Sequence, residues 1–309
     1  MYLILGSKED LCCRYVRDVL QAEGRDVTIV PNLLAPPLLF SWRFENAACA
    51  SMIAWEEAQG KVLSDAEIEG VLVRSIRWDS LTNLSLEDRA YVQTEIQAAV
   101  LAWLWSLSCP VANRYPAHIW FRSQDALLFW HPLLLRCGLP ALETLVSNVP
   151  GEARAFAERS LAGGALYAPL TSSARFPVTS DRDWAGIAAM QGYAPVSLTL
   201  PYEDPHVACV IGTQVVWDGN STPGEEFTSL ELAMVSFAAG SGLAFVEVSL
   251  ASTVKGVRVT GVNPYPHVEQ FSRDAQQKIA TRLARYLTSG TPGKGSSYML
   301  AVHSYLGGN

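Results

Sequence analysis

The chain has 309 residues, of which 49% are hydrophobic and 17% charged, so it can bury a sizeable core and lacks the composition of a disordered chain. Its formal net charge of −7 argues against a nucleic-acid partner, because phosphate backbones are bound through basic surfaces. The length favours two or three subdomains.

The apolar runs of the sequence do not have the pattern of targeting or membrane segments. The first, Met1–Gly6, is too short for a signal peptide and has no basic region before it. The most apolar later run, Ala98–Val111, is shorter than a bilayer requires and predicts a buried helix. We therefore expect a cytoplasmic protein with no membrane partner. Its six cysteines lack metal-ligand spacing and are expected to be reduced and packed as small hydrophobes.

The first part of the sequence predicts a parallel α/β unit. A strand at Tyr2–Leu5 precedes a helix at Asp10–Glu23, whose apolar residues recur at helical spacing, and a second strand at Val27–Val30. Strand–helix–strand with a right-handed crossover is the usual start of a parallel sheet. Phe40–Ala54 is rich in aromatic residues and is expected to be irregular. A further buried strand is predicted at Ile68–Arg74.

The middle of the chain alternates helices and strands. Ser85–Ser108 is predicted to be a long helix with Ser85 as its N-cap, because a serine side chain accepts the first free backbone N–H groups. Further helices are predicted at Phe121–Cys137 and Glu152–Leu161, with a strand at Leu145–Ser147 between them.

The last part of the chain predicts paired strands. Strands at Gly164–Leu170 and Pro195–Pro201 flank a polar loop, Thr171–Arg182, and a hairpin follows at His206–Trp217. A second hairpin is predicted at Phe245–Val262, turning at Lys255-Gly256, because glycine adopts positive φ without steric cost. The remaining predicted elements are helices, at Ser229–Gly242 and Gln270–Leu287.

Four short stretches carry a resemblance to one family. They are, in chain order, Pro-Val-Ala-Asn-Arg-Tyr-Pro (110–116), Gly-Leu-Pro-Ala-Leu-Glu-Thr (138–144), the hairpin at 206–217 and the hairpin that ends in Asn263-Pro264. Together with the order of the elements they resemble the ATP-grasp family, in its branch of ribosomal-protein glutamate ligases and graspetide macrocyclases. The resemblance extends from about residue 1 to residue 287.

The resemblance implies an α/β fold of the ATP-grasp type. It divides the chain into an N-terminal parallel α/β subdomain (1–116), two α+β lobes (117–201 and 202–288) and a Gly/Ser-rich tail (289–309). The family activates a carboxylate as an acyl phosphate, which needs cations on the triphosphate and carboxylates on magnesium.

Most of the family's site residues are replaced in this sequence. The position of the first lysine falls near Leu127-Leu128, and the second lysine is replaced by Ala168. His206 stands where the family has an arginine. Ser249 and Gly261 replace the two acidic metal ligands, and Asn263 alone remains.

Other charged residues are candidates to take over these contacts. Glu247 lies two residues before Ser249 and therefore faces the same side of its strand, so it is a candidate metal ligand with Asn263. The candidate cofactor-binding residues are Arg175, Arg182, His206 and Arg258. A solvated glutamate explains Glu247 equally well, and an exposed or packed histidine explains His206 better. The direction of Arg258 depends on the turn.

Three hypotheses follow from these residues. The preferred one is a non-catalytic ATP-grasp-like protein with no cofactor, which binds a peptide, a protein, a small carboxylate or a catalytic partner. The alternative is an active carboxylate–amine ligase that uses ATP and magnesium through the displaced residues. The third is a homo-oligomeric scaffold without a ligand.

Overall fold

The computed structural model describes residues 1–30, 39–45, 48–54, 63–74, 84–121, 127–149, 151–159, 164–170, 174–202, 205–219 and 223–290. The described residues belong to two compact units. Unit 1 comprises Met1–Ala117, Gly242–Phe245 and the chain from His267 on, and unit 2 comprises His118–Ser241 and Val246–Pro266. Both units mix helices with sheets, so the α/β class predicted from the sequence is confirmed.

Unit 1 is built on a parallel sheet with the strand order β2-β1-β6-β7. Its strands are β1 (Tyr2–Leu5), β2 (Val27–Val30), β6 (Gly70–Val73) and β7 (Val111–Ala112). The residues of β1 and β6 are all buried, as is typical of parallel strands covered on both faces. The predicted parallel start of the chain is thus confirmed.

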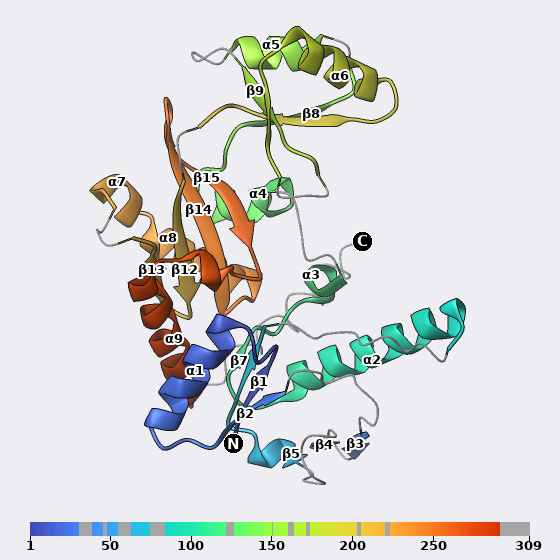
Figure 1. The fold of residues 1–309 in the computed structure, drawn as a ribbon, viewed down its shortest axis with the longest axis vertical. Coiled ribbons are helices and arrows are strands. Elements are labelled where there is room, and N and C mark those ends of the chain that lie inside the picture. The colour runs from blue at the N-terminus through green and yellow to red at the C-terminus, as the bar shows by residue number, and fades with distance from the viewer. Residues whose placement is uncertain are drawn as a thin grey trace, which may run out of the picture. The chain divides into compact units, whose positions relative to one another are not determined.

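Two helices from opposite ends of the sequence pack together in unit 1 (Figure 1). They are α1 (Leu11–Ala22) and α9 (Arg273–Thr288), and the short 3-10 helix η3 (Val268–Gln270) also contacts α1. Asp10 begins α1 by accepting the N–H of Cys13 at 3.0 Å. Gly70 permits the close approach of α9 to β6, because a Cβ there would lie 3.0 Å from the carbonyl oxygen of Leu287.

The long helix α2 (Leu86–Ser106) begins at its predicted N-cap, Ser85, whose side chain accepts the N–H of Asp88. Its C-terminal end is closed by Arg114, which lies beyond β7. The guanidinium donates to the carbonyls of Leu104, Trp105, Leu107 and Cys109. These contacts supply donors for carbonyls that have no partner within the helix.

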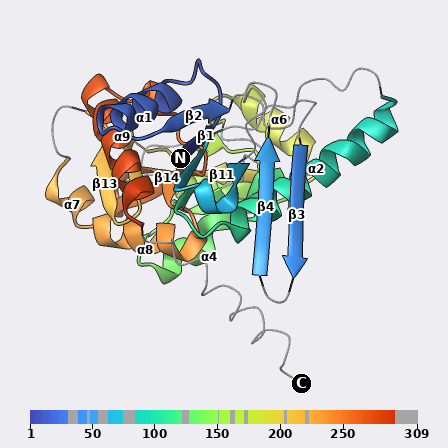
Figure 2. The same cartoon turned by 90° about the horizontal axis from the view of Figure 1, so that it is seen from below.

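A separate antiparallel sheet contains β3 (Leu39–Glu45), β4 (Ala48–Ala54) and β5 (Leu63–Ser64), followed by the 3-10 helix η2 (Asp65–Glu67). Strands β3 and β4 pair along their whole length, from Leu39 opposite Ala54 to Glu45 opposite Ala48 (Figure 2). The expectation that this stretch is irregular was therefore wrong. Aromatic residues favour strands, and three of the seven residues of β3 are aromatic.

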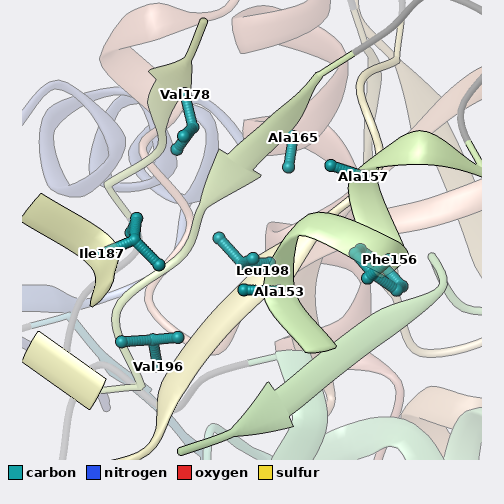
Figure 3. Packing of buried hydrophobic residues seen from close by; sticks show 8 residues of the cluster. All are labelled: Ala153, Phe156, Ala157, Ala165, Val178, Ile187, Val196 and Leu198. Atoms are coloured by element: carbon teal, nitrogen blue, oxygen red, sulfur yellow. The ribbon is translucent and has the colours of Figure 1, made fainter. Parts of the chain in front are cut away.

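The first sheet of unit 2 has the strand order β10-β9-β11-β8. Its strands are β8 (Thr144–Ser147), β9 (Ala165–Tyr167), β10 (Phe176–Val178) and β11 (Val196–Thr199). Helices α5 (Glu152–Glu158) and α6 (Asp181–Gln191) cover one face, and we name this assembly the central lobe. Its core joins Phe156 and Ala157 of α5, Ile187 of α6 and Leu198 of β11 (Figure 3).

The central lobe corrects one prediction. The described part of the expected polar loop, residues 174–182, contains strand β10 and the first turn of α6, a helix that was not predicted. The sequence signal was a capping box, in which Ser180 accepts the N–H of Asp183 and the Asp183 carboxylate accepts the N–H of Ser180. Thr171–Ser173 lie outside the described residues, as do Ser160 and Leu161 at the end of the predicted helix 152–161.

The second sheet of unit 2 has the order β13-β12-β14-β15, and we name it with its helices the last lobe. Its strands are β12 (His206–Ile211), β13 (Gln214–Trp217), β14 (Phe245–Thr253) and β15 (Gly256–Asn263). Both predicted hairpins are confirmed, and Gly256 has the positive φ of 86° that its turn requires.

Unit 2 also contains helices outside the central lobe: α4 (Leu127–Arg136), α7 (Glu225–Thr228), α8 (Glu231–Ser241) and all of α3 (Ala117–Phe121) except its first residue. The predicted helix 121–137 corresponds to the end of α3 and to α4, and residues 122–126 lie outside the described part. Helix α8 packs on β12 and β13, and α4 packs on α8 and β15.

The chain between the two lobes is hydrogen-bonded to β15. The N–H of Leu142 donates to the carbonyl of Val259 at 3.0 Å, and the N–H of Val259 donates to Pro140 at 2.9 Å. The predicted boundaries at 116, 201 and 288 stay a prediction, and the tail from residue 291 lies outside the described residues. Within the described residues, no helix is both long and apolar enough to cross a membrane.

Candidate functional site

The hairpin of β14 and β15 brings the two predicted metal ligands together. Glu247 lies directly opposite Asn263, and Ser249 lies opposite Gly261. Residues opposite each other in an antiparallel pair share a face of the sheet. Glu247, Ser249, Gly261 and Asn263 therefore form one continuous surface, which we name the hairpin face.

A β-bulge decides the direction of Arg258. The register shifts between Ser249 and Leu250, so that Thr260 is the extra residue and Arg258 lies opposite Ala251. Because Ala251 is two residues beyond Ser249, Arg258 belongs to the hairpin face and points away from the side of Val262. One guanidinium nitrogen of Arg258 donates to the neighbouring carbonyl of Val257 at 2.8 Å.

The hairpin face offers few oxygen ligands for a divalent cation. It carries the carboxylate of Glu247 and the amide oxygen of Asn263, and the latter accepts the N–H of Tyr265 at 2.9 Å. Magnesium takes carboxylates together with substrate phosphates, so one carboxylate is a minimal set. Among the described residues, no cluster of three or more His, Cys, Asp and Glu side chains is arranged to hold a metal ion.

His206 begins β12 in the same sheet, and its ring packs on an aromatic neighbour. The ring centroids of His206 and Phe227 are 4.4 Å apart in an edge-on arrangement, and Trp217 lies 6.3 Å from Phe227. The imidazole is exposed although one side rests on Phe227. Whether His206 contacts a phosphate stays a prediction.

The other two predicted arginines lie in the central lobe, on a different sheet. Arg175 directly precedes β10 and donates to the carbonyl of Ala174 at 2.9 Å. Arg182 is exposed in the first turn of α6. Hydrogen bonds from the backbone N–H groups of Ser180 and Thr179 lower the pKa of the neighbouring Asp183 carboxyl. The positive charge of Arg182 lowers this pKa further, but only weakly. Whether these arginines bind a phosphate remains a prediction.

An open hollow of about 260 Å³ lies in the central lobe between α5 and α6. Arg154 spans it, because its guanidinium pairs with Asp181 at 3.1 Å and lies 5.7 Å from the centre of the Trp184 ring. Glu158 and Thr179 complete the polar part of its lining. Sequence analysis missed this hollow, since it depends on α6, and the only signal was the acidic and aromatic pattern of residues 181–184.

The chain resembles known proteins in its fold and not in its sequence. No protein-family model and no curated protein sequence matches the chain. The macrocyclase MdnC of Microcystis aeruginosa MRC, bound with precursor peptide MdnA, has a TM-score of 0.71 at 16% identity, covering 93% of this chain and 99% of its own. The ATP-grasp ligase PsnB, complexed with a phosphomimetic precursor variant, Mg and ADP, reaches 0.73 at 19% identity, covering 94% and 96%.

A third solved structure, the RimK domain protein ATP-grasp from Sphaerobacter thermophilus DSM 20745, has a TM-score of 0.56 at 17% identity and covers 93% of this chain and 99% of its own. PsnB and the Sphaerobacter protein are described as ATP-grasp proteins, and all three structures are matched over nearly their whole length. This chain has an ATP-grasp fold. The fold predicted from the sequence is therefore confirmed.

Within this ATP-grasp fold, lysine is missing over a long stretch of the chain. The sequence has none between Lys61 and Lys255, so Lys255 is the single lysine of unit 2. Its ammonium lies at the tip of the last hairpin, 2.6 Å from the carboxylate of Glu143. Ala168, which stands where the resemblance implies a lysine, directly follows β9 and is buried, with its N–H bonded to the carbonyl of Ser197.

Proposed function

We propose that this protein uses an ATP-grasp fold to bind a peptide and does not carry out ATP-dependent ligation. The observation that carries this proposal is the absence of lysine from residue 62 to residue 254. That stretch includes the whole central lobe and both positions where the resemblance implies a phosphate-binding lysine. The one lysine that follows, Lys255, is already paired with Glu143.

The two missing lysines are expected to remove much of the binding free energy for a triphosphate. A hydrogen bond to a charged group is worth about 1.5–3 kcal/mol, so two missing lysines remove about 3–6 kcal/mol. This corresponds to a loss of roughly 10²- to 10⁴-fold in affinity for a triphosphate. Ser249 and Gly261 in place of acidic residues remove metal ligands as well, and metal bridges protein and phosphate in such sites.

Peptide binding is supported by the structural neighbours and by the hollow of the central lobe. MdnC and PsnB are complexed with precursor peptides. In this chain the hollow between α5 and α6 combines the Trp184 ring with the carboxylates of Glu158 and Asp181. A basic or aromatic side chain of a peptide would take the place of Arg154, which pairs with Asp181 and lies over the Trp184 ring. Such a side chain fits this lining because the ring attracts cations and the carboxylates pair with them.

The decisive experiment is a thermal-shift and calorimetric titration of the full chain with ATP and magnesium. A ligand that binds the native state raises the melting temperature by mass action. We expect no shift and no heat at millimolar ATP, with or without magnesium. A saturable shift that needs both ATP and magnesium would contradict the loss of ATP handling.

Peptide binding is tested separately with a displayed random-peptide library panned on the full chain. We expect enriched peptides to bind the wild type and to lose about tenfold or more in affinity for Trp184→Ala, because one aromatic anchor is worth about 1–2 kcal/mol. Tyr193→Ala is the matched control, since Tyr193 is an exposed aromatic residue of the same lobe. Equal loss in both variants, or no enrichment, would contradict the hollow as the site.

The arrangement of the hairpin face favours a second candidate, an active ligase with displaced contacts. Glu247, Asn263 and Arg258 share this face, so one acid, one amide and one cation lie along the same strand pair. If the protein is a ligase, ATP should be converted to ADP and phosphate as a peptide carboxylate and an amine form an amide, and Glu247→Gln should abolish this turnover. ADP formation at the same rate in wild type and Glu247→Gln excludes the candidate.

A further inference from the structure

Strand β8 forms one edge of the central lobe. It is the outermost strand of the sheet β10-β9-β11-β8, and its residues, Thr-Leu-Val-Ser, include neither a proline nor a charge. Val146 in the middle of β8 is 36% exposed. Proteins usually protect such an edge with proline, charged side chains or a covering segment, because an open edge accepts any extended chain.

Two other sheet edges of unit 2 are protected in this way. At the opposite edge of the central lobe, β10 holds Pro177, which has no N–H to offer to a neighbouring strand. At the outer edge of the last lobe, both backbone groups of Val259 in β15 are already bonded to residues 140 and 142. Strand β8 has neither kind of protection.

The pairing of β11 with β9 shows which backbone groups of β11 are left for β8. The N–H of Ala168 donates to the carbonyl of Ser197 at 2.9 Å, so the backbone of Ser197 faces β9. In an antiparallel sheet the N–H and C=O groups of successive residues point to alternate sides of the strand. The residues on either side of Ser197, Val196 and Leu198, therefore bond to β8.

The same alternation fixes the direction of the backbone groups in β8. The residues opposite Val196 and Leu198 are Ser147 and Leu145, which use their N–H and C=O groups within the sheet. Thr144 and Val146 alternate with them, so their N–H and C=O groups point away from the sheet. Within the described part of the chain, none of these four groups is hydrogen-bonded.

We propose that the edge of β8 binds an extended segment of another polypeptide, which joins the sheet as an additional strand. The four free groups fit the backbone of such a segment, because donors and acceptors recur in a strand every two residues, about 7 Å apart. The exposed Val146 favours a β-branched or aromatic residue directly opposite it in the added strand. The hollow is lined by Val178 of β10, at the other edge of the sheet, so this is a second and separate site.

The test is a displayed library of random heptapeptides, panned on the full chain after removal of the peptides that bind Val146→Pro. Proline at this position removes an outward N–H and no bond to β11, so the variant should keep the wild-type melting temperature. We expect the enriched peptides to bind Val146→Pro about tenfold or more weakly than the wild type, because a main-chain hydrogen bond is lost. Val146→Thr, which keeps the N–H and the branched side chain, is the matched control and should bind like the wild type.

N-methylation of an enriched peptide tests the main-chain pairing itself. Methyl groups on every second backbone nitrogen should abolish binding in one register and leave it unchanged in the other, because only alternate N–H groups of an added strand face β8. This measurement needs only the wild-type chain and peptides selected on it, so it decides the matter even when Val146→Pro does not fold.

Equal loss of binding in both registers overturns the inference, as does a library that yields no peptide with a preference for the wild type over Val146→Pro. A chain whose β8 pairs with the β8 of a second copy would be dimeric in sedimentation and would also overturn it. Enriched peptides that depend on Trp184 and not on residue 146 would overturn this second site and leave the proposed peptide site in the hollow standing.

Discussion

Polar residues at the strand ends of unit 1 are paired within the fold, whereas two positions on the hairpin face of unit 2 carry neutral residues in place of the acids that the resemblance implies. In unit 1, Asn113 follows β7 and exchanges two hydrogen bonds with the backbone of Phe245, at 2.6 and 2.7 Å. Arg74 follows β6 and pairs with Asp10 at 3.2 Å beneath the Phe245 ring. On the hairpin face, two positions where the resemblance implies acids are neutral, Ser249 and Gly261.

The difference follows from what each group does for folding. A buried polar group without its partner costs about 1–3 kcal/mol, and more when it is charged. Replacing one of the paired polar residues of unit 1 would therefore destabilise the fold. The positions on the hairpin face are partly exposed. Substitutions there are therefore expected to cost the fold little.

The largest effect that this comparison predicts is for Arg114→Met. The change removes the donors of four backbone carbonyls at the end of α2 and leaves them buried, so we expect about 3–5 kcal/mol less stability in urea unfolding. The matched variant Arg258→Met, on the hairpin face, should cost less than about 1 kcal/mol. Equal losses would break the comparison.

A smaller effect is expected when acids are returned to the hairpin face by Ser249→Asp with Gly261→Glu. The second change is sterically permitted, because a Cβ at residue 261 lies 3.7 Å from the Cβ of Ser249 in ordinary contact. Millimolar manganese or magnesium should stabilise the double variant by about 1–2 kcal/mol through mass action and leave the wild type unchanged.

The readout of that experiment is the melting temperature with metal and with a chelator, and Ser249→Asn with Gly261→Gln is the uncharged control. Without metal, three neighbouring carboxylates repel, so the acidic variant should melt below the wild type. A metal response of equal size in the control would mean that the hairpin face is not a latent metal site.

The smallest effect concerns the ion pairs of Glu143 with Lys255 and Arg159 at the hairpin tip. The Lys255 hydrogen bond lowers the pKa of the Glu143 carboxyl below its ordinary value of 4.5. The pair therefore stabilises the fold at pH above about 4.5 and loses this contribution as the pH falls below that value. Because Glu143 is partly exposed, the contribution is at most about 0.5 kcal/mol.

Glu143→Gln should accordingly lower the free energy of unfolding slightly at pH 6.5 and leave it unchanged at pH 3. Urea unfolding at both values measures the difference, with Glu95→Gln on the exposed part of α2 as control. A loss that is larger at pH 3 than at pH 6.5 would have the wrong sign for this pair.

Much of the fold was predictable because its signals are local. Apolar runs indicated β1, β2 and β6, and Ser85 marked the start of α2. Strands β3, β4 and β10 and helix α6 are among the elements that were missed. The β3–β4 hairpin lacks a turn signal of the Asn-Gly type, and its aromatic content was interpreted as a sign of irregular structure. Helix α6 begins in a polar stretch, and its capping box was overlooked.

The candidate site was predictable only where alternation within one strand suffices. Glu247 and Ser249 were expected to share a face, and the register shows that they do. The direction of Arg258 could not be derived, because it depends on a bulge whose extra residue, Thr260, leaves no mark in the sequence. The hollow near Trp184 was equally hidden, since it joins two helices through tertiary packing.

The short pairing of Pro140–Leu142 with Val259 has a consequence for solubility. The β14–β15 hairpin is long and rich in valine, and β15 is the outermost strand of its sheet. An open strand of this kind is a template on which other chains assemble into fibrils. The segment before the central lobe occupies both backbone groups of Val259, so this part of the edge is already paired within the chain and cannot accept another strand.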